Sequence, residues 1–152
     1  ELISQEFYQN KIYVADFFFT TCPDICPIMT ENMGYLQSEL KNQTDVLLVS
    51  FSVTPNVDSV DVLRSYADLK KVDDAKWNLF TGSKKEIYEL ARKSFLVAKN
   101  DGDGGKYDMI HTENFVLVDK ESRIRGFYDG TNEDEMKKLL VDITILKQSY
   151  LD

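Results

Sequence analysis

Two cysteines and one histidine are the residues of this sequence whose types and spacing could do chemistry. Cys22 and Cys26 lie four residues apart in the segment CPDICP, and His111 is the only histidine in the chain. A pair of thiols can form a reversible disulfide, or it can bind a soft metal ion together with an imidazole. The choice between these two chemistries is the main functional question that the sequence poses.

The cysteine pair lies where a predicted strand meets a predicted helix. An apolar run over residues 12–19 precedes the pair, and apolar residues from Met29 to Leu40 follow it at helical spacing. If Cys26 is in the first helical turn, the unpaired N–H groups and the dipole of the helix point at both sulfur atoms. This favours the thiolate, which is both the nucleophile and the metal ligand. Two buried structural thiols are the alternative, but a proline after each cysteine is typical of an exposed, stiffened loop.

Length and charge narrow the class of protein. The 152 residues, with a net charge of −8, are predicted to form one domain over residues 1–152 that does not bind nucleic acid. No stretch approaches the roughly 20 apolar residues that a membrane span needs. Because the sequence begins at Glu1 without a methionine, we interpret it as a cut or mature fragment, so that any membrane anchor, and most of any leading hairpin, would lie before Glu1. Membrane contact would then be made through such an anchor alone.

The order of the predicted elements indicates an α/β fold. Strands are predicted over 12–19, 46–53, 78–80, 115–118 and 124–128, and helices are predicted from about Pro27, from Asp58 or Ser59, from Ser83, and from Thr131 and Asp134. Strand–helix alternation predicts parallel strands with right-handed crossovers, and the final hairpin adds an antiparallel strand. A central mixed sheet flanked by helices, with cysteines at the first strand–helix junction, resembles the thioredoxin-like arrangement.

The position and chemistry of His111 favour a metal ligand. In a thioredoxin-like sheet, the segment entering the strand at 114–119 lies beside the cysteine loop, and His111 is in that segment. Thioredoxins typically have a cis-proline there, which this chain lacks. A hydrogen-bonded surface or core histidine is the alternative. Two thiolates and one imidazole suit copper better than structural zinc, which takes four protein ligands.

Three sequence blocks, in order along the chain, resemble the Sco/SenC family. The segment TCPDICP at 21–27 is similar to the family pattern T-x-C-P-x-x-C-P, and SFSVTPNVD at 50–58 is similar to S-x-V-D-P-x-x-D. His111, before the strand segment FVLVD, resembles the family's metal-ligand histidine. Thr54 departs from the second pattern, in which an aspartate is usual.

This resemblance implies both a fold and a function. It implies a thioredoxin fold, anchored to a membrane outside the cytoplasm on the periplasmic side, and one copper ion bound by Cys22, Cys26 and His111. It further implies a role in building the copper A centre of cytochrome c oxidase. The expected partner is the copper-bearing subunit of that oxidase or another copper chaperone.

Three acidic residues are further candidates for the site. Asp58 keeps the second acidic position of the family pattern and could cap a helix, dock a partner or tune the redox properties of the cysteines. Asp24, between the cysteines, is a candidate for docking a partner or for contacting the metal ligands. Asp16 is six residues before Cys22, where thioredoxins have a buried acid that carries protons for the thiols. Burial would raise the pKa of this carboxyl and allow proton uptake near neutral pH. An acid at a strand end, paired with lysine or solvent, is the alternative.

The leading hypothesis is therefore a copper metallochaperone, which is not an enzyme. The alternative is an extracytoplasmic thiol–disulfide oxidoreductase, in which Cys22 attacks, Cys26 resolves the mixed disulfide and Asp16 carries the proton. A peroxidase of the same fold is a weaker reading, because no Arg or Lys adjoins Cys22 in the sequence to activate it.

Overall fold

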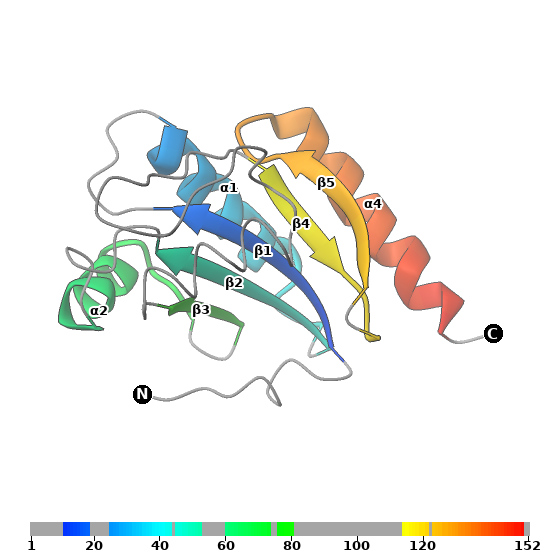
Figure 1. Ribbon diagram of the computed structural model, residues 1–152, viewed down its shortest axis with the longest axis horizontal. Helices are drawn as coiled ribbons and strands as arrows, with labels where there is room; N and C mark the ends of the chain where they lie inside the picture. The colour runs from blue at the N-terminus through cyan, green and yellow to red at the C-terminus, as the bar shows by residue number, and fades with distance from the viewer. Residues whose placement is uncertain are drawn as a thin grey trace, which may run out of the picture.

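A computed structural model describes residues 11–18, 25–43, 45–52, 60–73, 76–80, 114–121 and 123–150 of the chain (Figure 1). These ranges hold five strands and three helices: β1 (Ile12–Phe18), α1 (Ile25–Glu39), β2 (Val46–Ser52), α2 (Val60–Leu69), β3 (Trp77–Phe80), β4 (Asn114–Val118), β5 (Ile124–Asp129) and α4 (Glu133–Ser149). Each predicted element within these ranges is confirmed, with boundaries that differ by a few residues at most. The helix predicted from Ser83 lies outside the described residues.

The five strands form one mixed sheet in the order β3-β2-β1-β4-β5. β1 pairs in parallel with β2 from Ile12↔Val46 to Phe18↔Ser52, and β2 pairs in parallel with β3. On its other side β1 pairs antiparallel with β4, and β4 pairs antiparallel with β5. The predicted single α/β domain with a central mixed sheet is thus the architecture of the described part of the chain.

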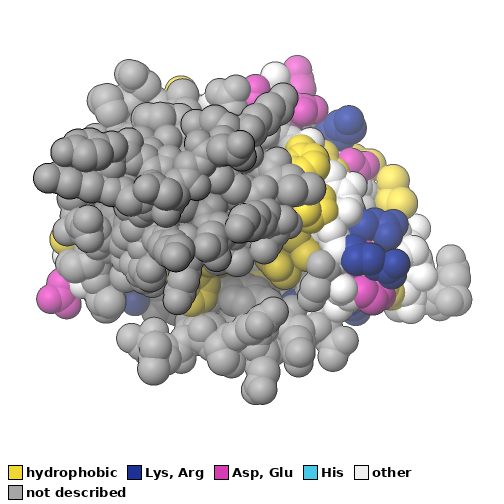
Figure 2. Space-filling model, viewed as in Figure 1, with side chains coloured by type: hydrophobic (Ala, Val, Ile, Leu, Met, Phe, Trp, Pro, Cys, Tyr) yellow, Lys and Arg dark blue, Asp and Glu magenta, His cyan; other side chains and the backbone are white. Residues whose placement is uncertain are grey.

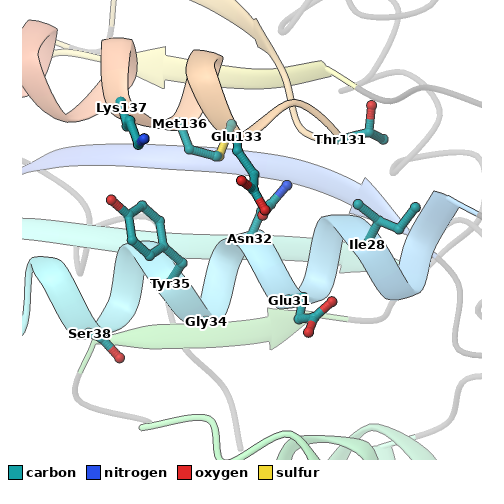
Figure 3. A pocket seen from close by; sticks show the side chains of 10 residues that line it. All are labelled: Ile28, Glu31, Asn32, Gly34, Tyr35, Ser38, Thr131, Glu133, Met136 and Lys137. Atoms are coloured by element: carbon teal, nitrogen blue, oxygen red, sulfur yellow. The ribbon is translucent and has the colours of Figure 1, made fainter.

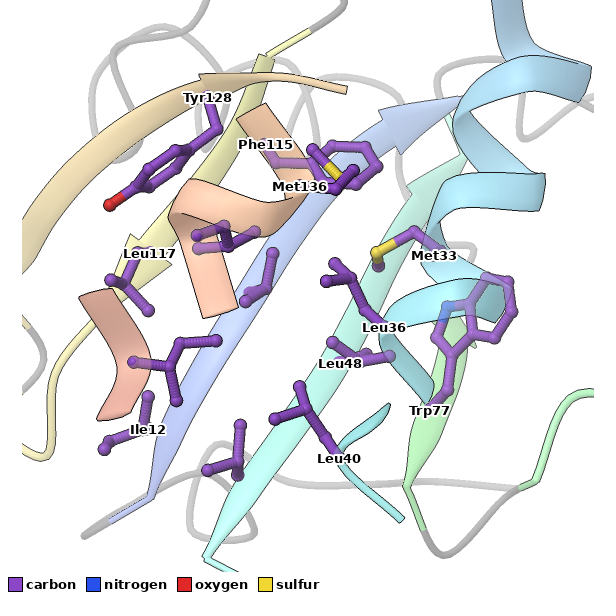
Figure 4. Close-up of a cluster of buried hydrophobic side chains, with 14 of the residues drawn as sticks. Ile12, Met33, Leu36, Leu40, Leu48, Trp77, Phe115, Leu117, Tyr128 and Met136 are labelled. Atoms are coloured by element: carbon purple, nitrogen blue, oxygen red, sulfur yellow. The ribbon is translucent and has the colours of Figure 1, made fainter. Parts of the chain in front are cut away.

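Side-chain alternation divides the central strand between two faces. Ile12 and Val14 point to the face that α1 and α4 cover, where they join the main cluster of buried apolar side chains (Figure 4). The intervening residues point to the opposite face, where Phe17 stacks on Phe51 of β2 and Phe51 stacks on Phe80 of β3. β1 is therefore buried on both faces, as its nearly continuous apolar run predicts.

The inward face of α1 changes composition along the helix. Met29 and Met33 occupy its N-terminal half, whereas Leu36 and Leu40 lie at its C-terminal end, and all four side chains are buried in the main cluster. The predicted spacing is confirmed, and the packing of α1 over β1 and β2 can be followed in Figure 4.

The last helix begins one residue away from its predicted start. Asn132 is the N-cap of α4, because its side-chain oxygen accepts hydrogen bonds from the backbone N–H groups of Asp134 and Glu135. Thr131, predicted to open the helix, instead donates its hydroxyl to the Asp129 carboxylate at 2.6 Å. The predicted inward residues Met136, Leu139 and Ile143 are buried, and Leu140 is partly buried against the same cluster.

α2 packs beside β3 and also contacts β1 and α1. Leu63 and Tyr66 pack against Phe18 at the end of β1, and the Tyr66 hydroxyl is 2.9 Å from that of Thr30 on α1. These contacts place α2 on the same face of the sheet as α1. Asp58 and Ser59, predicted to cap this helix, lie outside the described residues.

Lys71, two residues beyond the end of α2, gives a test of this local structure. Lys71 has φ = 58°, a left-handed conformation that favours glycine and costs other residues about 1–2 kcal/mol. Lys71→Gly should therefore raise the free energy of unfolding by up to about 1 kcal/mol, after allowance for the greater freedom of glycine in the unfolded chain. Lys71→Ala is the matched control, since it removes the side chain but retains the strained backbone. Chemical denaturation of both variants measures the difference, and an equal effect would contradict this explanation.

Candidate functional site

The predicted site residues are only partly within the described residues. Cys22, Asp24, Asp58 and His111 lie outside them. Cys26 is the second residue of α1, so the expected position in the first helical turn is confirmed for its backbone, although its side chain is outside the description. Within the described ranges, no three His, Cys, Asp or Glu side chains form a group that could hold a metal ion.

The topology brings three functional segments to one end of the sheet. β1 and β4 are antiparallel, with Ala15 opposite Val116 and Tyr13 opposite Val118. The last residues of β1 therefore lie beside the first residues of β4, at the upper left of the sheet in Figure 1. α1 begins at the same end. The chain thus leaves β1 toward Cys22, enters α1 around Cys26, and enters β4 three residues after His111.

Asp16 is the predicted site residue whose side chain the structure describes. It lies near the C-terminal end of β1 and is only 1% exposed. Its Oδ1 atom accepts a hydrogen bond from the hydroxyl of Ser50, the residue directly opposite it on β2. Among the described residues no lysine or arginine forms a salt bridge with it, so the strand-end acid paired with lysine is not what this part of the structure shows.

This environment changes the acidity of Asp16. Burial raises the pKa of its carboxyl from the ordinary value of 3.8 to about 7, because the charged form loses its hydration. The hydrogen bond from Ser50 acts in the opposite direction, since it stabilises the carboxylate. The group therefore gains or loses a proton near neutral pH, which fits the behaviour predicted from the sequence.

A second buried carboxyl, that of Asp119, shows how different the surroundings of Asp16 are. Oδ1 of Asp119 accepts backbone N–H groups from Glu121 and Arg123, both at 2.9 Å. Its Oδ2 lies 3.4 Å from Nη1 of Arg125. These partners satisfy both carboxyl oxygens and tie together the β4–β5 hairpin. Asp16, by contrast, has a single neutral partner among the described residues.

Sequence reasoning missed two residues that belong to this arrangement. Ser50 donates to Asp16 and accepts a hydrogen bond from Nε1 of Trp77 at 3.0 Å. Both partners are buried. A polar residue interrupting the apolar strand at Ser50 was a signal, but only the strand register shows that it faces Asp16.

A surface groove separates α1 from α4 (Figure 3). It has a volume of about 560 Å³, and its lining is mixed, from Ile28 and Met136 to Glu31, Glu133 and Lys137. Asn32 on its floor donates to the carbonyl of Gly130 at 2.6 Å, which ties α1 to the turn before α4. The described residues that line the groove do not include Asp16.

Several charged side chains on the described surface form ion pairs. On the face shown in Figure 2, basic side chains lie next to acidic ones on the side where β5 runs in Figure 1. Arg123 bonds Glu121 at 2.7 Å, and Lys120 and Lys147 both approach Asp45. Of the helices in the described ranges, none has the length and apolar character needed to cross a membrane.

Comparison with solved structures identifies the class of fold. BsSco superposes with a TM-score of 0.78 and 33% identity, covering 95% of this chain and 84% of that one. A SCO1/SenC family lipoprotein from Bacillus anthracis gives the same TM-score at 32% identity, covering 93% and 84%. The domain therefore has the thioredoxin-like Sco fold.

Sequence comparison identifies the family. The SCO1/SenC family model matches residues 1–144. The SCO1 protein homolog of Bacillus subtilis is 34% identical over 145 residues, which is 93% of this chain and 74% of that protein. This chain belongs to the SCO1/SenC family.

The buried carboxyl predicts a dependence of stability on pH. Because the folded-state pKa of Asp16 is raised, the folded protein binds a proton more tightly than the unfolded chain, and stability falls as pH rises from about 4 to about 7. Asp16→Asn, which cannot ionise, should therefore gain stability relative to the wild type, by roughly 2–3 kcal/mol between pH 5 and pH 8. Guanidinium unfolding of both reduced proteins across this pH range measures the gain. The exposed Asp61→Asn is the control, and a parallel pH dependence for Asp16→Asn and wild type would refute the prediction.

Proposed function

We propose that this domain is a copper metallochaperone that binds one copper ion through Cys22, Cys26 and His111 and delivers it during assembly of the copper A centre of cytochrome c oxidase. The observation that carries the proposal is the meeting of the β1 end, the α1 start and the β4 start at one end of the sheet. In this reading the protein transfers a metal ion by ligand exchange and is not an enzyme.

Chain connectivity supports the proposed ligand set. Cys22 follows the end of β1 by four residues, and His111 precedes β4 by three. An extended chain spans at most about 3.6 Å per residue, so these short connections limit how far Cys22 and His111 can lie from that end of the sheet. Cys26 is already there, in the first turn of α1. Two thiolates and one imidazole are soft donors that suit copper, and they are too few for a structural zinc site.

The relatives support the metal and the pathway in general terms. A protein of Stutzerimonas stutzeri that is 27% identical over 131 residues is named a putative copper-binding protein. BsSco is described as a member of the Sco family of cytochrome c oxidase assembly proteins. The specific ligands, the one-to-one stoichiometry and the copper A target are our proposal for this chain.

The proposed location and partner follow from the same family. Because the Bacillus anthracis relative is described as a lipoprotein, we place the domain outside the cytoplasm, on the periplasmic side, attached to the membrane through a segment beyond this sequence. The proposed partner is the copper-bearing oxidase subunit or another copper chaperone. Asp24 and Asp58 remain candidates for contacts with that partner or with the metal ligands.

Thiol–disulfide exchange is the second candidate function, and the buried carboxyl of Asp16 favours it. Cys22 thiolate would attack a target disulfide, and Cys26 thiolate would then displace the target, so that the target is reduced and the pair oxidised. Asp16 would accept the proton of the Cys26 thiol. BsSco is described as containing a disulfide switch, which supports redox chemistry in the family. Oxidation of the pair would abolish the proposed copper site, so the two roles are linked.

The proposed site predicts how single substitutions change copper affinity. We expect the reduced protein to bind one Cu(I) tightly in competition with a chelator. Removing a residue that hydrogen-bonds to a metal ligand typically reduces metal affinity about 10–100-fold. His111→Ala and Cys22→Ala remove a ligand itself, so each should reduce the copper affinity at least about 100-fold.

Gln148→Ala, an exposed substitution on α4, is the control for this titration and should bind copper as the wild type does. Affinity that is unchanged in either ligand variant would rule out the three-ligand site. Weak binding that is indifferent to His111 would favour the thiol–disulfide oxidoreductase instead, and the reduction potential of the cysteine pair would then separate the two functions.

A further inference from the structure

A chain of three buried polar side chains crosses three adjacent strands. Nε1–H of Trp77 on β3 donates to Oγ of Ser50 on β2 at 3.0 Å, and the Ser50 hydroxyl donates to Oδ1 of Asp16 on β1. Trp77 and Asp16 are each 1% exposed and Ser50 is 2% exposed. The indole N–H can only donate, so the serine hydroxyl proton is directed toward the carboxyl. The direction of both hydrogen bonds that join Trp77, Ser50 and Asp16 is thereby fixed.

The row of hydrogen-bonded side chains ends, at Asp16, beneath the helix that carries Cys26. Asp16 shares its face of β1 with Val14, which packs in the cluster that contains Met29 and Met33 of α1, and with Phe18, which packs against α2. The carboxyl therefore faces the N-terminal half of α1, toward the end of the sheet where the cysteine segment begins.

The described elements around this carboxyl offer it little charge compensation. α1 presents Met29, Thr30 and Met33 to this region, and α2 presents Leu63 and Tyr66. Tyr66 is the titratable group among them, and its hydroxyl lies 2.9 Å from that of Thr30. Lys70 contacts the ring of Tyr66, with Nζ 5.8 Å from its centroid, and forms no salt bridge with Asp16 in the described part of the chain. Ser50 is thus the direct partner through which the described protein controls the carboxyl.

We propose that Ser50 is a positioning residue, which holds the Asp16 carboxyl in one orientation beneath α1 and sets the pH at which this carboxyl exchanges a proton with the cysteine pair. The inference deepens the redox side of the proposed function and rests on it for the link to the cysteines. In that proposed function, the S–H bond of the Cys26 thiol breaks as the thiol ionises, and an O–H bond forms on Asp16, which takes up the proton. No electrons change hands in this step.

The hydroxyl of Ser50 has a defined effect on Asp16. It stabilises the carboxylate relative to the protonated acid, against the effect of burial. The hydrogen bond received from Trp77 polarises the hydroxyl and strengthens the bond that it donates. Removal of the hydroxyl should therefore make Asp16 bind its proton more tightly, by roughly tenfold or one pH unit, as expected for a hydrogen bond to a charged group.

The single tryptophan of the chain provides the readout. Trp77 is joined to Asp16 through Ser50, so its emission should change with pH in one step near the midpoint of Asp16, about 7 in the wild type. In Ser50→Ala the midpoint should rise by about one pH unit. Ser50→Thr, which retains the hydroxyl and suits a strand, should restore the wild-type midpoint. The ¹³C shift of the Asp16 carboxyl measures the same titration directly.

Two controls assign the signal. Asp16→Asn should abolish the step, and His111→Ala should leave it in place, which separates the carboxyl from the imidazole. Equal midpoints for Ser50→Ala and the wild type would overturn the role of Ser50, whatever the protein does with copper. If Ser50→Ala does not fold, Ser50→Thr still tests the proposal. This variant keeps the hydroxyl, so an Asp16 midpoint about one pH unit above that of the wild type would also overturn the role of Ser50.

The link to the cysteines is tested separately. The reduction potential of the cysteine pair, measured against a dithiol buffer from pH 5 to pH 9, should change slope at the Asp16 midpoint, and this change should move upward in Ser50→Ala. A carboxyl midpoint that moves while the potential curve does not would overturn the coupling. Neither result depends on copper affinity, so failure of the metal site and failure of this inference are distinguishable.

Discussion

The pairing of β1 on both of its edges is the constraint on which the rest of the structure depends. Parallel pairing with β2 requires a crossover, which α1 supplies, and this crossover lays the helix across the face that Ile12 and Val14 bury. Antiparallel pairing with β4 returns the chain from a distant part of the sequence to the end of β1. One strand thereby fixes the relative positions of three segments that are far apart along the chain.

A polar group near the end of this central strand is unusual for its surroundings. The other residues of β1 on the helix face are apolar and contribute to the core, whereas Asp16 is buried there as a carboxyl with one neutral partner among the described residues. Asp119 shows that the same sheet can also bury a carboxylate with several donors. The difference in hydrogen bonding separates a group that stabilises a hairpin from one that remains free to take up a proton.

Periodicity was sufficient to predict the elements, because each strand and helix buries a face whose spacing is visible in the sequence. The inward residues of α1 and the hairpin β4–β5 are examples. The start of α4 was harder, since Thr131 and Asn132 are both capable caps and only the local hydrogen bonds distinguish them. The partners of Asp16 were not predictable, because Ser50 and Trp77 reach it through strand register, which depends on the whole sheet. The ligand set came from motif spacing and family resemblance, and it remains a prediction.

The composition of the inward face of α1 gives the helix a graded stiffness. Leu36 and Leu40, at the end remote from the cysteines, are branched side chains with few alternative conformations in a packed core. Met29 and Met33, at the end that carries Cys26, are unbranched and can rotate to fill a changed space with little loss of contact. The C-terminal end of α1 is therefore held by rigid side chains, whereas its N-terminal end, next to the cysteine segment, packs through adaptable ones. A rearrangement of the cysteine segment can be absorbed locally by two thioether side chains, while the sheet and the remaining core keep their packing.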